Sequence, residues 1–145
     1  MPAFCPDPLT VEILSQGAGQ PCRVRLVLPD GSGGEGQLDP DALSAQVRAL
    51  LVSWSAAPQD TGRALFQALF PGDLSGQFSG TLAAARDRGL RLILKIDPTL
   101  PVLHRLPWER LYYPTGGQWL PLATSPHIFL SRHLQTGQPW DLPLP

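Results

Sequence analysis

The chain has 145 residues, and with 43% hydrophobic content it suits one globular domain that buries about two thirds of its unfolded surface. Its formal net charge is -1, with basic and acidic residues interleaved, which excludes any electrostatic signature of nucleic-acid or anionic-membrane binding. An apolar run of the roughly 20 residues needed to span a membrane is absent, and so are the features of a signal peptide. Two cysteines are too few for a disulfide framework or a structural zinc site. We therefore expect a cytoplasmic protein without a cofactor.

The first predicted elements are two strands, 9–14 and 22–28, whose glycine-containing connection favours a hairpin. Glu12 on the first strand would face either Arg23 or Arg25 on the second strand across this pair. The segment 29–36 is rich in glycine and predicts a turn. It formally matches the G-x-G-x-x-G phosphate loop, but no helix begins directly after it, so we expect no nucleotide site there.

Three helices are predicted between residues 39 and 89. Asp39 and Pro40 suit the N-cap and first turn of the first helix. The residues expected to form its core face are Leu43, Val47, Leu50, Leu51 and Trp54. The apolar residues of the other two helices are Leu65, Phe66, Leu69 and Phe70, and then Leu74, Phe78, Leu82 and Ala85. Gly89 takes the position at which a glycine ends a helix.

A strand over 90–96 follows, because apolar and polar residues alternate there until Asp97 and Pro98 end it. The segment 100–113 carries too much apolar area for a loop, and two further strands are predicted over 119–123 and 127–134. The order β-β-α-α-α-β-turn-β-β predicts an α/β fold, in which about three helices pack on a mixed sheet of about five strands. Strand 90–96 is expected to run parallel to one of the first two.

These elements define a single domain over residues 1–138. The proline-rich segment 139–145 is interpreted as a linker or a terminal strap. Its apolar residues Trp140, Leu142 and Leu144, together with the unpaired edge of a terminal strand, are candidates for a protein interface. The partner would be the other half of a larger protein, an upstream sensor or repeat domain, or a second copy of this chain.

Several residues in the last third of the chain carry a resemblance to a known family. They are Leu106, Pro107, Trp108 and Glu109 in one turn, the pair Leu111 and Tyr112, and Arg132 on the last strand. With the strand before them, they resemble the N-terminal half of a CHAT domain, the caspase-like domain of bacterial proteins that is often linked to tetratricopeptide repeats. Tyr113 departs from the family pattern, in which an aspartate is usual.

The resemblance implies that this chain has no catalytic residues. In the related cysteine proteases, a histidine followed by glycine activates a cysteine that follows a later strand. Here His104, His127 and His133 are followed by other residues, while Cys5 and Cys22 lie near the N-terminus. We therefore expect a non-catalytic structural or regulatory module that supports or gates a protease half absent from this chain. The alternative is a self-contained binding or oligomerisation module, and a cysteine hydrolase using Cys22 or Cys5 is a weaker third hypothesis.

Glu109 is predicted to be structural. Because Pro107 restricts the backbone and Trp108 would anchor the turn, we expect the carboxylate to point toward the interior, where an ionised group needs a partner. Arg132 on the last strand is the natural partner, since its guanidinium offers bidentate geometry. The competing hypothesis makes Glu109 a general base, although no nucleophile or metal-ligand set accompanies it. The chain is accordingly expected to hold no metal.

Overall fold

The computed structural model describes residues 6–17, 20–85 and 87–134. Its five-stranded sheet contains β1 (Asp7–Leu14), β2 (Cys22–Val27), β3 (Gly33–Leu38), β4 (Leu90–Ile96) and β7 (Ile128–Leu134). The helices are α1 (Pro40–Leu51), α2 (Pro58–Leu69), α3 (Leu74–Ala84) and the short α4 (Pro101–His104). A small hairpin of β5 (Tyr112–Thr115) and β6 (Gln118–Pro121) is flanked by the 3-10 turns η1 (Trp108–Arg110) and η2 (Leu122–Thr124). The predicted α/β class is confirmed.

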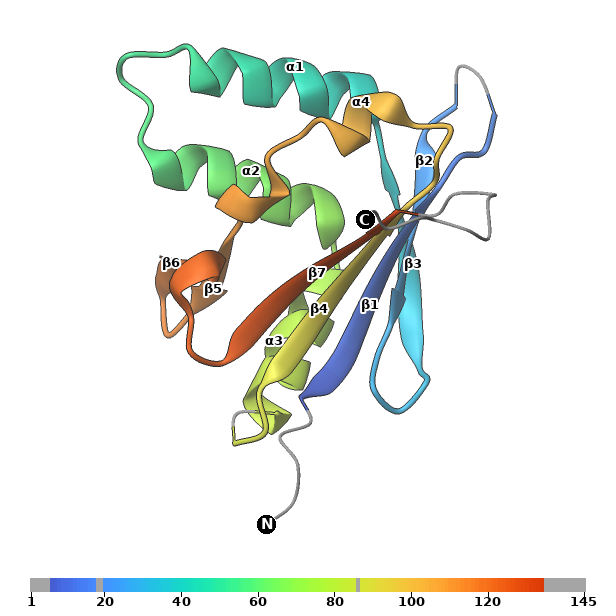
Figure 1. The fold of residues 1–145 in the computed structure, drawn as a ribbon, viewed down its shortest axis with the longest axis vertical. Coiled ribbons are helices and arrows are strands. Elements are labelled where there is room, and N and C mark those ends of the chain that lie inside the picture. Colours follow the sequence, from blue (N-terminus) through green and yellow to red (C-terminus); the bar gives the residue numbers. More distant parts are fainter. Residues whose placement is uncertain (1–5, 18–19, 86, 135–145) are drawn as a thin grey trace, which may run out of the picture.

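The sheet is mixed, with the strand order β3-β2-β1-β4-β7. β1 is antiparallel to β2 and parallel to β4, β2 is antiparallel to β3, and β4 is parallel to β7. The parallel pairing predicted for strand 90–96 is therefore confirmed. All four helices and the β5-β6 hairpin lie on the same side of the sheet (Figure 1). The side chains on the other side of the described sheet face away from every described helix.

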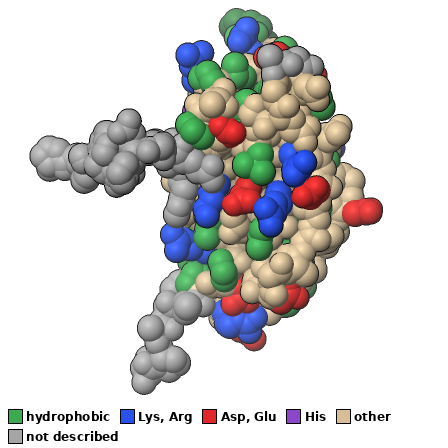
Figure 2. Space-filling model, turned by 90° about the vertical axis from the view of Figure 1, so that its right-hand side faces the viewer, with side chains coloured by type: hydrophobic (Ala, Val, Ile, Leu, Met, Phe, Trp, Pro, Cys, Tyr) green, Lys and Arg blue, Asp and Glu red, His purple; other side chains and the backbone are tan. Residues whose placement is uncertain are grey.

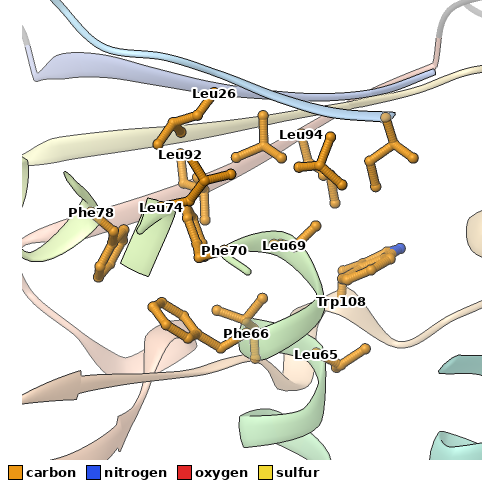
Figure 3. Close-up of a cluster of buried hydrophobic side chains, with 14 of the residues drawn as sticks. Leu26, Leu65, Phe66, Leu69, Phe70, Leu74, Phe78, Leu92, Leu94 and Trp108 are labelled. Atoms are coloured by element: carbon orange, nitrogen blue, oxygen red, sulfur yellow. The ribbon is translucent and has the colours of Figure 1, made fainter. Parts of the chain in front are cut away.

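The core lies between the sheet and the helices, and it follows from the alternation of residues in the strands. Leu9, Val11 and Ile13 of β1 lie opposite Leu92, Leu94 and Ile96 of β4, and all six are at most 2% exposed. The sheet leucines point toward the aromatic residues of α2 and α3 (Figure 3). Phe66, Phe70 and Phe78 form a group of rings with centroids 4.7 to 5.1 Å apart, close enough for favourable aromatic contacts.

One predicted turn and one predicted strand differ from the structure. The segment 29–36 was expected to be a turn throughout, but β3 begins at Gly33 and pairs with β2 along its whole length. The predicted strand 119–123 is not part of the large sheet, because β6 pairs with β5 and residues 122–124 form a 3-10 turn. β3 therefore supplies the fifth strand of the sheet.

The predicted core face of the first helix is wrong at its C-terminal end. Leu43 and Val47 are buried as expected, but Leu50 is only partly buried and Leu51 is 48% exposed. The helix ends at Leu51, and Trp54 lies beyond it, fully exposed. The start of the helix agrees with the prediction, since the Asp39 carboxylate accepts hydrogen bonds from the backbone N–H groups of Asp41 and Ala42.

Candidate functional site

The turn that carries the family resemblance is anchored by Trp108. Its side chain is completely buried, and its indole Nε1 donates a hydrogen bond of 2.8 Å to the backbone oxygen of Leu103. Leu106 and Leu111 on either side of it are also buried. A buried indole needs such an acceptor, because an unpaired N–H group in the interior is costly. The turn is thus held firmly against the core.

Arg132 of β7 connects this turn to the sheet. It lies opposite Leu94 in the register between β4 and β7, on the side of the sheet that faces the helices. Its Nη1 donates to Oε2 of Glu109 over 2.7 Å, and its Nη2 donates to the backbone oxygen of His104 over 2.8 Å. The ion pair expected between Arg132 and Glu109 is present, but the expected interior position is wrong, since the Glu109 side chain is 60% exposed.

The electrostatics of Glu109 favour the ionised form of its carboxylate. Partial burial raises its pKa, but the hydrogen bond and the positive charge of Arg132 outweigh that effect, so the pKa lies below its ordinary value. A general base that works near neutral pH needs a carboxylate with a raised pKa. The shift at Glu109 has the opposite direction, which supports a structural role for this residue.

A groove of about 560 Å³ runs along β7 beside the ion pair. The residues that line it are Glu109, Leu122, Ala123, Ser125, Ile128, Phe129, Leu130 and Arg132. β7 is an edge strand of the described sheet, and its outer side adjoins this mostly apolar groove. Edge strands accept extended segments as additional strands, while neighbouring pockets select side chains. This edge of the molecule is therefore suited to docking of an extended protein segment.

The side of the sheet away from the helices is a second candidate surface. Glu35, Arg25, Glu12 and Lys95 lie in one row across β3, β2, β1 and β4. In this row Arg25 and Glu12 approach to 3.9 Å, in agreement with the pairing expected for one of the two arginines. Half-buried Ile93 and 40% exposed Phe129 add apolar area. Basic, acidic and hydrophobic side chains are interspersed on this face (Figure 2).

Cys22 and His104 are poorly placed for nucleophilic catalysis. Cys22 is 1% exposed, and burial together with the nearby carboxylates of Asp97, Asp39 and Asp41 raises the pKa of its thiol. A reactive cysteine needs the opposite, a lowered pKa and an electropositive surrounding. His104 is engaged through Nε2 with the backbone oxygen of Asp97 at 3.1 Å.

Other features bear on the remaining predictions. Within the described residues, His, Cys, Asp and Glu side chains form no group of three or more suited to a metal ion. The helices of the same residues are all too short or too polar to cross a membrane. Cys5 and the candidate interface residues Trp140, Leu142 and Leu144 lie outside the described residues, as does the segment 139–145.

Sequence reasoning found the turn and Arg132 but missed the groove and the open sheet face. The groove arises from η2 and β7, which pack together although nothing in their sequences specifies the contact. The sequence of β4 did indicate an outward-facing side, because Arg91, Ile93 and Lys95 alternate with buried leucines. That pattern indicates a strand with one face on the core, but it does not reveal on which side the helices lie.

Comparison of this chain with protein-family models, with curated proteins and with solved structures finds no match.

Proposed function

We propose that this domain is the non-catalytic half of a CHAT-type, caspase-like protein, in which it supports and gates a protease half through the edge of β7 and the open face of the sheet. The observation that carries the proposal is the sheet itself. β1, β4 and β7 run parallel, yet the described helices cover one face of them. Parallel strands in proteins are almost always covered on both faces. A covering partner would complete this arrangement.

The groove beside β7 gives the proposal a route for gating. Arg132 ties β7 to Glu109 and to the backbone of His104, so the position of the edge strand depends on the turn before it. A partner that adds a strand to β7 would contact Leu130 and Ser125 in the same groove. Movement of the turn would then alter the docking edge, which is how a regulatory signal would reach the protease half.

The proposal is tested by reading whether the coding sequence continues after residue 145 and, where it does, by producing the longer protein. A CHAT-type protein should contain there a strand followed by His-Gly and, later, a cysteine after another strand. In that longer protein, backbone amides of β7 should exchange with deuterium more slowly than in the 145-residue chain. Helix α3, on the helical side of the sheet and outside both proposed docking surfaces, is the internal control and should exchange equally in both.

A matched pair of variants separates docking from general stability. Ala123→Asp would place a charge at an exposed position of the β7 groove, whereas Leu120→Asp would change a 38% exposed leucine of β6 outside it. The first variant should lose the protection of β7, and the second should retain it. Equal exchange of β7 with and without the downstream segment would refute the proposal. A reading frame without the His-Gly and cysteine segments would favour the alternative, a self-contained binding or oligomerisation module.

A further inference from the structure

The C-terminal end of α1 exposes a group of large hydrophobic side chains that has no role in the function proposed above. Leu51 is 48% exposed, Val52 is 74% exposed and Trp54 is fully exposed. Tryptophan is enriched at the energetic centres of protein interfaces, where it buries about 150–250 Å². A group of this kind on a protein surface marks a docking site. It lies on the helical side of the molecule, away from the open sheet face.

The opposite end of α1 adjoins a cavity of about 630 Å³. The residues of its wall include Pro21, Cys22, Pro40, Leu100, Pro101 and Val102, together with the carboxylate-bearing Asp39 and Asp41. Its wall thus combines prolines and aliphatic side chains with the polar residues Ser15, Gln20 and Thr99, whose oxygens can accept a hydrogen bond from an indole N–H group. Helix α1 has 12 residues, so the exposed tryptophan and the cavity are separated by roughly 18 Å along its axis.

The outer side of α1 between these two ends is complementary to itself. Asp41, Ala45, Arg48 and Val52 recur at intervals of three or four residues and are all exposed. The acidic residue lies in the first turn and the basic residue in the last turn. A second α1 that runs in the opposite direction would bring unlike charges together at both ends, whereas a parallel one would bring like charges together. Small Ala45 in the middle permits close approach of two helices.

We propose that the chain forms a symmetric dimer in which α1 packs antiparallel against α1 of a second copy, with Trp54 of each copy inserted into the cavity at the start of the other copy's α1. Asp41 precedes Ala45 by four residues, about 6 Å along the helix, and Arg48 follows it by three, about 4.5 Å. With the symmetry axis at Ala45, Arg48 of one copy falls within about 1.5 Å of the level of Asp41 of the other. Two equivalent ion pairs result, as symmetry requires.

The exposed apolar group of Leu51, Val52 and Trp54 fits the same arrangement. Because the helices are antiparallel, the C-terminal end of one α1 lies beside the N-terminal end of the other, where the cavity is. The tryptophan of one copy therefore lies at the same end of the helix pair as the cavity of the other copy. Each dimer would contain two such insertions, which explains why a side chain as apolar as Trp54 is exposed in the single chain.

Sedimentation equilibrium of the full 145-residue chain tests this proposal. The natural chain should show a concentration-dependent monomer–dimer equilibrium. Asp41→Arg and Arg48→Asp should each weaken the homodimer by about tenfold or more, because each places like charges opposite one another. An equimolar mixture of these two variants should associate about as strongly as the natural chain, since each copy then supplies the charge that the other needs.

Trp54→Ala should weaken the dimer by about tenfold or more, and Leu120→Ala, at an exposed site outside α1, should leave it unchanged. Far-ultraviolet circular dichroism establishes that each variant is folded. A natural chain that stays monomeric at roughly millimolar concentration, where even weak association with a Kd near 1 mM is detectable, would overturn the proposal. So would charge-reversal variants that associate as the natural chain does, or a mixture of them that does not associate.

Discussion

Arg132 and Glu109 join β7 to the turn anchored by Trp108, with 2.7 Å between Nη1 and Oε2. The same guanidinium donates to the backbone oxygen of His104 over 2.8 Å. The two contacts differ in environment, since the bond to Glu109 is exposed, with the Glu109 side chain 60% accessible, whereas the bond to His104 is partly buried. Solvent screens the ion pair strongly, and exposed pairs of this kind contribute about 0.2–1 kcal/mol. Arg132 should therefore matter more to stability than Glu109 does.

Replacement of each partner tests this asymmetry. Glu109→Gln should lower the free energy of unfolding by less than about 1 kcal/mol, and Arg132→Met by about 1–3 kcal/mol, because the second change also leaves the His104 carbonyl without its donor. Urea denaturation of both single variants and of the double variant measures the coupling, which should be below about 1 kcal/mol. Equal losses in the two single variants would contradict the interpretation.

A larger loss of unfolding free energy is expected when Leu94 is replaced, since this core residue is 1% exposed and lies in the middle of the sheet. Leu94→Ala should lower the free energy of unfolding by about 2–5 kcal/mol, since it removes buried methyl groups and leaves a cavity. Ile93→Ala is the matched control, because Ile93 neighbours it on β4 but lies half-buried on the open face. Denaturant unfolding that gives the larger loss at Ile93 would contradict the described packing.

Strand β4 could be predicted from the sequence because its pattern is strong and local. Four apolar residues alternate with others, and Asp97 with Pro98 ends the strand. β3 could not, because three of its six residues are glycines, which have low strand propensity. The reason for the glycines is tertiary: a Cβ at Gly34 would lie 2.9 Å from Leu74 Cδ2, and one at Gly36 would lie 2.6 Å from Pro71 Cγ. Close packing of the sheet against α3 and the residues before it selects Gly34 and Gly36.

The errors at α1 and Glu109 have a similar origin. Helical periodicity continues from Leu43 to Trp54, but the helix ends at Leu51, so the last periodic residues face solvent. Periodicity identifies a face of a helix without fixing where the helix stops. At Glu109, the presence of a salt bridge followed from the residue types, whereas the exposure depends on where β7 and η2 lie. Local sequence contains no information on that placement.

Two glycines offer a test of the helix packing. An added Cβ at Gly62 of α2 would lie 2.7 Å from the backbone oxygen of Arg110 and would also collide with the Tyr112 side chain, so Gly62→Ala should destabilise the protein by about 1–3 kcal/mol. At Gly80 of α3 an added Cβ meets nothing within 4 Å. Gly80→Ala should therefore stabilise by up to about 1 kcal/mol, because alanine is the better helix former. Thermal unfolding that shows the same sign for both changes would contradict this packing.

The environment of Cys22 predicts an unreactive thiol. Because burial and nearby carboxylates raise its pKa, Cys22 should react with iodoacetamide at least roughly tenfold more slowly in the folded chain than in the chain unfolded by urea. The measurement is made in a Cys5→Ser background, so that one thiol is followed by mass spectrometry. The same chain should not cleave a peptide library. Cleavage that disappears in Cys22→Ala would instead favour a cysteine hydrolase.

The contact between Asp7 at the start of β1 and Arg88 before β4 predicts how stability depends on pH. Arg88 donates from Nη2 over 2.7 Å and from Nε over 3.1 Å to the carboxylate. These hydrogen bonds, opposed by slight desolvation and aided by the positive charge, lower the pKa of Asp7. The folded-state pKa is thus below the unfolded value, and the unfolded chain binds more protons between the two values. The stabilising contribution is fully present above the unfolded pKa, about 3.9, and is lost as the pH falls through the folded pKa.

Asp7→Asn should therefore flatten the decline of unfolding free energy with falling pH below about pH 5, compared with the natural chain. Arg88→Gln should produce the same flattening, because the carboxylate then loses the hydrogen bonds that lower its pKa. Glu35→Gln removes one negative charge from the β3 edge, 4.0 Å from Arg23, and serves as the control for net charge. Urea denaturation from pH 2 to pH 7 measures all four chains. If Glu35→Gln flattens the decline of unfolding free energy at low pH as much as Asp7→Asn does, the effect comes from net charge. A specific contribution of the contact between Asp7 and Arg88 would then be disproved.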